Sequence, residues 1–182
     1  MKKNIWIFGL LSGLIVAIFM VVSTTLCYRN PNFEGSMLVG YAGMLLAFSF
    51  VFVGIKNYRD KFNNGTITFI QALKIGGLIT LISSTVYVVV WLFDYYLFVP
   101  DFMDKYIAHI IKQAKAEGAS QAELNKQITE MADYKEMYKS PVGVILITYT
   151  EILPVGLVVT LISALILKRK PKNTNPVIAQ AA

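Results

Sequence analysis

The sequence predicts an all-α membrane protein, in which four transmembrane helices form a bundle and a periplasmic amphipathic helical hairpin lies between the third and the fourth. Two observations predict this fold class. Of the 182 residues, 55% are hydrophobic and 15% are charged, whereas about a quarter of the residues of a soluble domain are charged. Charged residues are also nearly absent from four stretches that are long enough to cross a hydrocarbon layer of about 30 Å as helices. The predicted spans are residues 4–28, 35–55, 69–98 and 141–167, and the predicted hairpin is 101–140.

The first span follows Lys2 and Lys3, and this start is similar to that of a secretory signal. Its uncharged run over residues 4–28 is longer than the apolar region of a signal peptide, and no small-residue cleavage site ends it. We therefore expect an uncleaved helix. Cys27, the one cysteine, cannot form an intramolecular disulfide and is expected to be an inert apolar side chain.

A basic turn joins the second and third spans. We expect Lys56 and Arg59 in a loop after the second span, and Asn64-Gly65 is a strong signal for a tight turn. Thr68 is well placed to cap the third helix. These residues form a candidate cytoplasmic surface.

Between the third and fourth spans, apolar residues recur every three or four positions in two segments, which predicts two amphipathic helices. Gly118 separates the two patterns, and Ser120 with Glu123 predicts a capping box for the second helix. Pro100 and Pro141 bound the hairpin. Three alternatives are open for the apolar stripes: they pack on each other, they lie on the membrane, or they dock a protein partner.

The distribution of basic residues predicts the topology. Clusters of Lys and Arg precede the first span and follow the second and fourth, so all three lie on one side, which the positive-inside rule makes cytoplasmic. The segment 101–140 has six Lys and seven Asp or Glu, a balance that suits an exported loop. We predict that both termini are cytoplasmic, that residues 1–170 form one domain, and that 171–182 are a disordered cytoplasmic tail.

Glu151, Asp94 and Arg29 are candidates for a polar cluster within the membrane, since ionisable residues in a span are usually functional. At 1.5 Å per residue, Glu151 lies about 24 Å from the cytoplasmic end of the fourth span, and Asp94 and Arg29 lie near the same outer level. One interpretation is an outward-facing vestibule in which Glu151 takes up a proton or a cation. The other is an ion pair or hydrogen-bonded cluster that caps the bundle, with Glu151 paired to Arg29 or a tyrosine hydroxyl.

Pro154 and Gly156 are candidates for a helix kink and for close helix packing in the fourth span. Proline removes one helical hydrogen bond and leaves backbone carbonyls without their usual donor. Small residues spaced by four, such as Gly156 with Thr160 and Gly43 with Ala47, favour a compact four-helix bundle.

Other function classes are disfavoured. The net charge of +6 comes from residues that flank the apolar runs, which argues against nucleic-acid binding. His109 is the one histidine, so a multi-histidine metal site is excluded. The sequence has no glycine-rich phosphate loop, nucleophile elbow or Cys-x-x-Cys pair. We therefore predict no catalytic site, no metal and no cofactor.

Two stretches of the chain carry a resemblance to a known family. Residues 54–76, which include the basic turn, and residues 151–156 resemble a bacterial membrane family known as domain of unknown function 4199, and the likeness extends over 4–170. The resemblance implies a four-span integral protein of the bacterial inner membrane with no assigned activity. We expect a non-enzymatic protein that acts through contacts with lipids or with a protein partner at the hairpin. The alternative is a small proton- or cation-coupled transport component that uses Glu151 and associates with further copies of itself.

Overall fold

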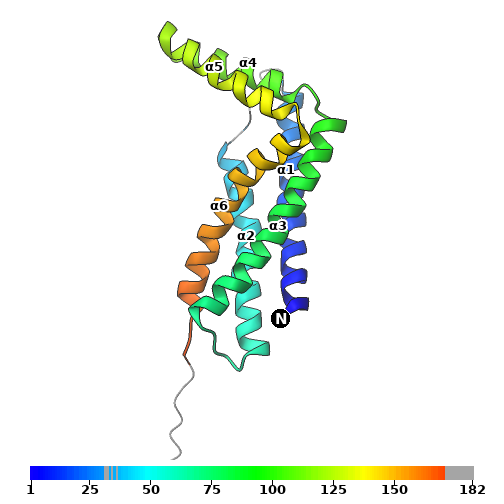
Figure 1. The fold of residues 1–182 in the computed structure, drawn as a ribbon, viewed down its shortest axis with the longest axis vertical. Coiled ribbons are helices and arrows are strands. Elements are labelled where there is room, and N and C mark those ends of the chain that lie inside the picture. Colours follow the sequence, from blue (N-terminus) through cyan, green and yellow to red (C-terminus); the bar gives the residue numbers. More distant parts are fainter. Residues whose placement is uncertain (31–32, 34, 36, 171–182) are drawn as a thin grey trace, which may run out of the picture.

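The computed structural model describes residues 1–30, 33, 35 and 37–170, and these form six helices (Figure 1). Four of them are long and apolar enough to cross a membrane, so the predicted class of all-α membrane protein is confirmed. The predicted disordered tail, 171–182, lies outside the described residues. The helices are α1 (Lys2–Arg29), α2 (Met37–Phe62), α3 (Phe69–Leu97), α4 (Phe102–Ala116), α5 (Gln121–Tyr138) and α6 (Pro141–Leu167).

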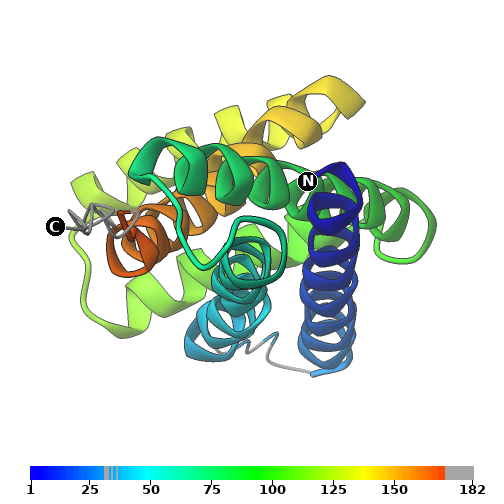
Figure 2. The same ribbon diagram turned by 90° about the horizontal axis from the view of Figure 1, so that it is seen from below.

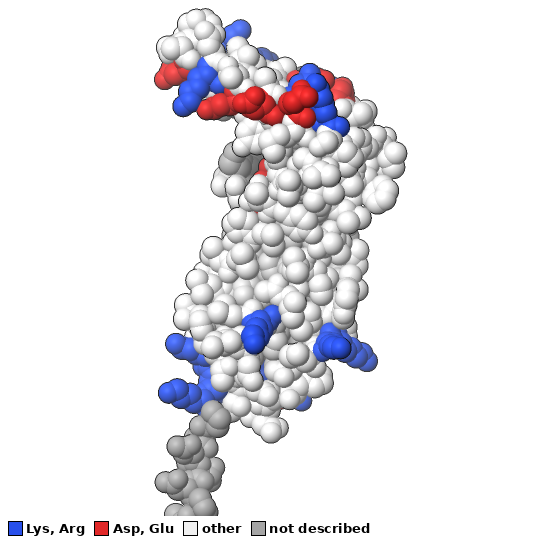
Figure 3. All heavy atoms as spheres, viewed as in Figure 1, with Lys and Arg blue, Asp and Glu red and all other residues white. Residues whose placement is uncertain are grey.

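The four long helices form one bundle, and the two short helices cross one end of it (Figures 1 and 2). Helices α2 and α3 each pack on both α1 and α6. The start of α1 and the end of α6 are both at the end opposite α4 and α5, on different sides of the bundle. Figure 3 shows Lys and Arg gathered near that end, both charge signs on α4 and α5, and an uncharged surface between. We call the two ends the basic end and the hairpin end.

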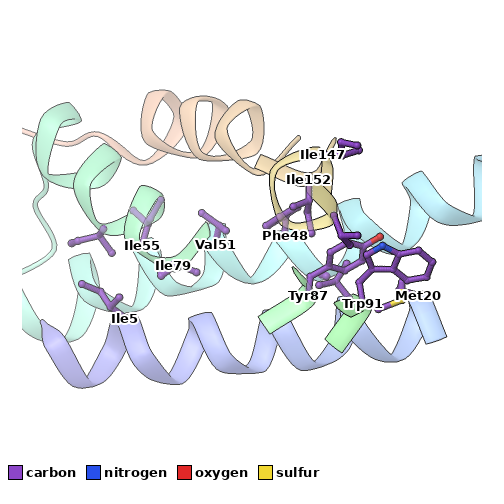
Figure 4. Close-up of a cluster of buried hydrophobic side chains, with 14 of the residues drawn as sticks. Ile5, Met20, Phe48, Val51, Ile55, Ile79, Tyr87, Trp91, Ile147 and Ile152 are labelled. Carbon is purple, nitrogen blue, oxygen red and sulfur yellow. The ribbon is translucent and has the colours of Figure 1, made fainter. Parts of the chain in front are cut away.

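The centre of the bundle is closely packed. Phe48, Val51 and Ile79 have no exposed surface and belong to a buried cluster that runs along the helices (Figure 4). Helix α6 packs tightly in the bundle at Gly156, where a Cβ atom would lie 2.4 Å from Cγ2 of Thr80. A side chain at this position therefore has no room.

Buried hydroxyl groups join the helices across this core. Ser12 of α1 donates a hydrogen bond to the carbonyl oxygen of Ala47 (2.8 Å), and its hydroxyl lies 3.0 Å from that of Ser83. On the other side of α3, the hydroxyls of Thr80 and Thr160 are 2.9 Å apart. In a membrane, contacts of this kind contribute to helix association because lipid offers no hydrogen-bond partner.

The basic end is closed by a short turn and a two-residue bridge. Asn64 and Gly65 have φ angles of 49° and 72°, in the left-handed region that these residue types tolerate best. The predicted cap is confirmed, because Thr68 forms a capping box with Gln71 at the start of α3. Ile67 then pairs with the chain after α6: its N–H donates to the carbonyl oxygen of Arg169 (3.0 Å), and the N–H of Arg169 donates back (2.8 Å).

The predicted loop at this end is too long. Helix α2 does not end near residue 55 but continues to Phe62, so Lys56 and Arg59 lie on its last two turns and outside the turn itself. Lysine and arginine are good helix formers, and their charge is favourable at a helix C-terminus, which explains the extension. From its helical position Arg59 donates to the carbonyl oxygen of Leu167 (3.4 Å) and binds Asp60 (2.6 Å).

Candidate functional site

A chamber of about 410 Å³ lies at the hairpin end, between three long helices, α1, α3 and α6, and the crossing helices α4 and α5. Figure 3 shows a hollow beneath the hairpin with acidic atoms inside it. A volume of this size is in the range of small-molecule sites. The described residues that line it are Met20, Thr24, Tyr87, Trp91, Phe102, Met103, Tyr106, Met131, Tyr134, Tyr138, Ile147, Thr148 and Glu151.

The hairpin that roofs the chamber folds as the sequence pattern predicts. Helix α4 ends before Gly118, whose φ of 82° suits glycine, and Ser120 with Glu123 forms the predicted capping box at the start of α5. Ala114 and Leu124 are buried, so the tip of the hairpin is held by contacts between α4 and α5. The two apolar stripes therefore pack partly on each other, while the remainder faces the chamber or, at Ile128, the exterior.

Aromatic contacts hold the roof against the bundle. Trp91 of α3 meets Phe102 of α4 edge to face, with ring centroids 5.2 Å apart. Tyr95 of α3 meets Tyr138 of α5 in the same way at 5.3 Å. Such pairs stabilise by about 0.5–1.5 kcal/mol beyond the area they bury. They give the chamber walls a defined arrangement.

Glu151 is the one acidic residue among the described residues that line the chamber, and none of these is Lys, Arg or His. Its side chain is exposed to the chamber, and no salt bridge or hydrogen bond joins its carboxylate to any described residue. The charge of Glu151 acts on phenols of the roof. Burial raises the pKa of Tyr138 to about 12, and the charge of Glu151 adds to this effect. Burial and then Glu151 also raise the pKa of Tyr106.

Pro154 lies one turn beyond Glu151, inside α6, which continues through it to Leu167. Because proline has no N–H, the carbonyl group of Thr150 lacks its helical donor. A backbone oxygen next to Glu151 in the chain is therefore free of its usual hydrogen bond. Gly156, on the following turn, forms the close contact with Thr80 described above.

The other two members of the predicted polar cluster lie elsewhere. Asp94 of α3 is 7% exposed and does not line the chamber, and its Oδ2 atom has no hydrogen-bond partner. Arg29 lies at the end of α1 and lines a second cavity of about 360 Å³, with Lys105 and Lys112 of α4. No ion pair joins Glu151 to Arg29 within the part of the chain that the structure describes.

Helix α4 separates the two cavities. Phe102 and Tyr106 on one face line the chamber, whereas Lys105 and Lys112 on another face line the basic cavity. Lys105 is held there by Asp101 at 3.2 Å and lies over the ring of Tyr28, 3.7 Å from its centroid. The hairpin thus keeps its basic side chains away from Glu151.

The predictions from the sequence do not identify the aromatic residues of the chamber as a group, although their spacing along the chain is a signal for them. They form three pairs, each spaced by four residues so that both rings lie on one face of a helix. We call them the three aromatic pairs: Tyr87 with Trp91 on α3, Phe102 with Tyr106 on α4, and Tyr134 with Tyr138 on α5. Figure 4 shows the α3 pair beside Met20 at one end of the buried cluster.

Metal binding finds no support in this geometry. Across residues 1–30, 33, 35 and 37–170, no group of three His, Cys, Asp or Glu side chains comes together in a way that could hold a metal ion.

Comparisons with known proteins give a family and no activity. No curated protein and no solved structure matches the chain. The family model described as "Protein of unknown function (DUF4199)" matches residues 7–169, which is most of the chain and includes all the residues that line the chamber. The resemblance seen in the basic turn and at Glu151 is therefore confirmed, and the chain belongs to the DUF4199 family.

Proposed function

We propose that this is a non-enzymatic protein of the bacterial inner membrane whose outer chamber binds a ligand that carries positive charge. The observation that carries the proposal is Glu151: a carboxylate faces a chamber of about 410 Å³ with no cationic partner among the described residues that line it. A carboxylate in surroundings that are poor in water is costly without a compensating charge. A cationic ligand would supply that charge.

The difference in charge between the two ends of the bundle supports one orientation in the membrane. The basic end holds the start of α1, with Lys2 and Lys3, and the end of α2, with Lys56, Arg59 and Lys61, while α4 and α5 carry both charge signs. By the positive-inside rule the basic end is cytoplasmic, so both termini are inside and the hairpin is periplasmic. The chamber then opens at the outer surface of the membrane, where ligands of the periplasm or the outer leaflet meet it.

The make-up of the chamber supports binding over catalysis. Its described lining has no His, Lys, Cys or Ser, the side chains that most often serve as nucleophiles or as their bases. Its two threonines are Thr24 and Thr148, and Thr148 donates its hydroxyl hydrogen to the carbonyl oxygen of Val144 (2.7 Å) within the same helix.

Chemical labelling of Glu151 tests this proposal. The purified protein in detergent is treated in parallel with a hydrophobic carbodiimide, which labels carboxyl groups in apolar surroundings, and with a water-soluble carbodiimide, which labels exposed ones. The modified peptides are measured by mass spectrometry. We expect cationic solutes to protect Glu151 and to leave unchanged the labelling of Glu130, an exposed residue of α5. Equal protection of both carboxylates would reflect ionic strength alone and would contradict the proposal, as would no protection.

A second candidate, proton- or cation-coupled transport through Glu151, has one observation in its favour. Ser84 of α3 is fully buried, and its Oγ atom has no hydrogen-bond partner. Ser84 lies one helical turn from Thr80 along α3, on the side nearer the hairpin end. Buried hydroxyl groups therefore extend from that side toward the Thr80–Thr160 pair. No ionisable side chain lies deeper in the middle of the four spans, which limits a relay to hydroxyl groups.

Flux measurements in liposomes separate the two candidates. Transport predicts ion or proton flux above that of protein-free vesicles, lost in Glu151→Gln and kept in Glu130→Gln. Binding without transport predicts the same background flux for all three proteins, with protection of Glu151 from the carbodiimide retained in the unmutated chain.

A further inference from the structure

The chamber combines its single carboxylate with an unusual share of aromatic surface. The three aromatic pairs approach it from α3, α4 and α5, and Met20, Met103 and Met131 fill gaps between them. Aromatic faces carry negative electrostatic potential and attract cations, and a carboxylate adds to that attraction. Methionine sulfur is polarizable and adapts to irregular shapes. Aromatic residues of the lining can therefore add to the attraction that Glu151 exerts on positive charge.

This lining discriminates between classes of cation. Divalent metal ions require several oxygen ligands, and one carboxylate with scattered hydroxyls does not supply them. A primary ammonium carries three N–H groups that each need an acceptor when buried. A quaternary ammonium nitrogen, which bears four alkyl groups and no N–H, needs no hydrogen-bond acceptor, and its alkyl groups bury apolar surface against the rings. The chamber suits this last class best.

The walls are set in place before any ligand arrives. The edge-to-face contacts of Trp91 with Phe102 and of Tyr95 with Tyr138 hold rings from three helices in defined positions. A binding site that is already ordered loses less conformational entropy when it binds. Tyr134, which is 46% exposed and lies on the roof, is the least constrained of the aromatic residues that line the chamber.

We propose that the chamber binds a quaternary ammonium group between the three aromatic pairs and the carboxylate of Glu151. This inference rests on the proposed function and names its ligand class. Two sources share the chemistry: the headgroup of a lipid in the outer leaflet, and a small soluble compound of the periplasm. The chamber lies at the outer ends of the spans, so both can reach it.

Trp91 provides a direct probe of binding. The chain has two tryptophans, and Trp6 is near the basic end, so a Trp6→Phe protein reports fluorescence from the chamber alone. We expect tetramethylammonium chloride to change the Trp91 emission in a saturable way, while equal concentrations of sodium chloride and ammonium chloride do not. Glu151→Gln and Tyr134→Leu should each weaken the response by about tenfold. Glu130→Gln and Tyr41→Leu are the matched controls, since neither residue lines the chamber.

The source of the ammonium group is found by repeating the measurement in bilayers. Nanodiscs of phosphatidylglycerol are compared with nanodiscs that also contain phosphatidylcholine, whose headgroup carries a trimethylammonium. A change in Trp91 emission with phosphatidylcholine identifies the lipid source. A response to soluble tetramethylammonium alone identifies a solute.

Other outcomes overturn the proposal. If sodium or ammonium ions act as well as tetramethylammonium and the effect depends on Glu151, the ligand class is wrong and the broader function as a cation-binding protein stands. If no cation changes the emission and none protects Glu151 from the carbodiimide, both proposals fail. Helix content measured by circular dichroism shows whether a variant that loses the response is still folded.

Discussion

At the basic end of the bundle the buried polar groups have partners, whereas at the hairpin end several do not. The side-chain amide of Asn4 donates to the carbonyl oxygen of Gly54 (2.9 Å), and Asn57 donates to Asn4 (2.6 Å). At the other end, Oδ2 of Asp94 lacks a hydrogen-bond partner, and Glu151 faces an open chamber. Unsatisfied polar groups are costly, so proteins keep them where they serve a purpose.

The burial of the apolar and aromatic side chains named here also differs between the two ends. Ile55, Ile67 and Ile75 at the basic end are at most 2% exposed. Tyr106 and Tyr134 on the roof of the chamber are 37% and 46% exposed. The comparison indicates that the basic end and the centre stabilise the fold, while the hairpin end holds a surface that is available for binding. Substitutions in the two regions should therefore have different effects.

The largest effect is expected from Gly156→Ala in the centre of the bundle. The new Cβ would lie 2.4 Å from Thr80 and 2.8 Å from the ring of Phe48, so α2, α3 and α6 would have to separate. We expect the free energy of unfolding to fall by about 3 kcal/mol, at the upper end for overpacking. Gly77→Ala is the control, because no atom lies within 4 Å of a Cβ there. Unfolding in mixed micelles measures both, and equal stability of the two variants would disprove the close packing.

A smaller and more local effect is expected from Gly143→Ala at the junction of α5 and α6. The added Cβ would lie 1.9 Å from the carbonyl oxygen of Met137, which forces the roof to move. We expect faster hydrogen exchange in α4 and α5, with little change in α1 to α3, because these do not depend on that junction. Gly40→Ala, which meets nothing within 4 Å, is the matched variant. An equal increase in hydrogen exchange in all the helices would show that the stabilities of the two ends are not independent.

The two regions also differ in how far the sequence predicts them. Apolar runs identify the spans, and short local motifs identify the caps at Thr68 and Ser120, because these features depend on neighbours in the chain. The predicted end of the second span, at residue 55, lies before the end of α2 at Phe62, because the prediction ends the span where the charged residues begin at Lys56. Charge ends a membrane span but is compatible with a helix that continues into water.

The candidate site was predicted only in part. Counting residues along a helix places Glu151, Asp94 and Arg29 at similar heights, and the structure places Glu151 and Arg29 in different cavities. The position of a residue along a helix does not tell which way its side chain points around the helix axis. That direction relative to the other helices depends on packing between segments far apart in the sequence. The chamber likewise needs α4 and α5 to fold back over α6, which no local pattern specifies.

A pH-dependent effect of intermediate size is expected from Tyr138 on the roof. Burial raises the pKa of its phenol from the ordinary value of 10.0 to about 12, so the folded protein retains a proton that the unfolded chain loses. Stability from this group is complete below pH 10 and is lost as the pH rises toward 12, by at most about 2.7 kcal/mol. Melting temperature as a function of pH should fall less steeply in Tyr138→Phe. If the melting temperature falls equally steeply with pH in both proteins, the phenol of Tyr138 is exposed to water and its pKa is not raised.

The smallest effect is expected from the ion pair of Lys135 with Asp104, which joins α5 to α4 on the outside of the hairpin. Both side chains are about half exposed, at 48% and 59%, so solvent screens their attraction. Asp104→Asn should lower the free energy of unfolding by less than about 1 kcal/mol, and added salt should remove the difference. Because the roof is held mainly by aromatic contacts, the response of Trp91 to tetramethylammonium should be unchanged in this variant. A loss of that response would mean that surface charge, and not ring packing, positions the roof over Glu151.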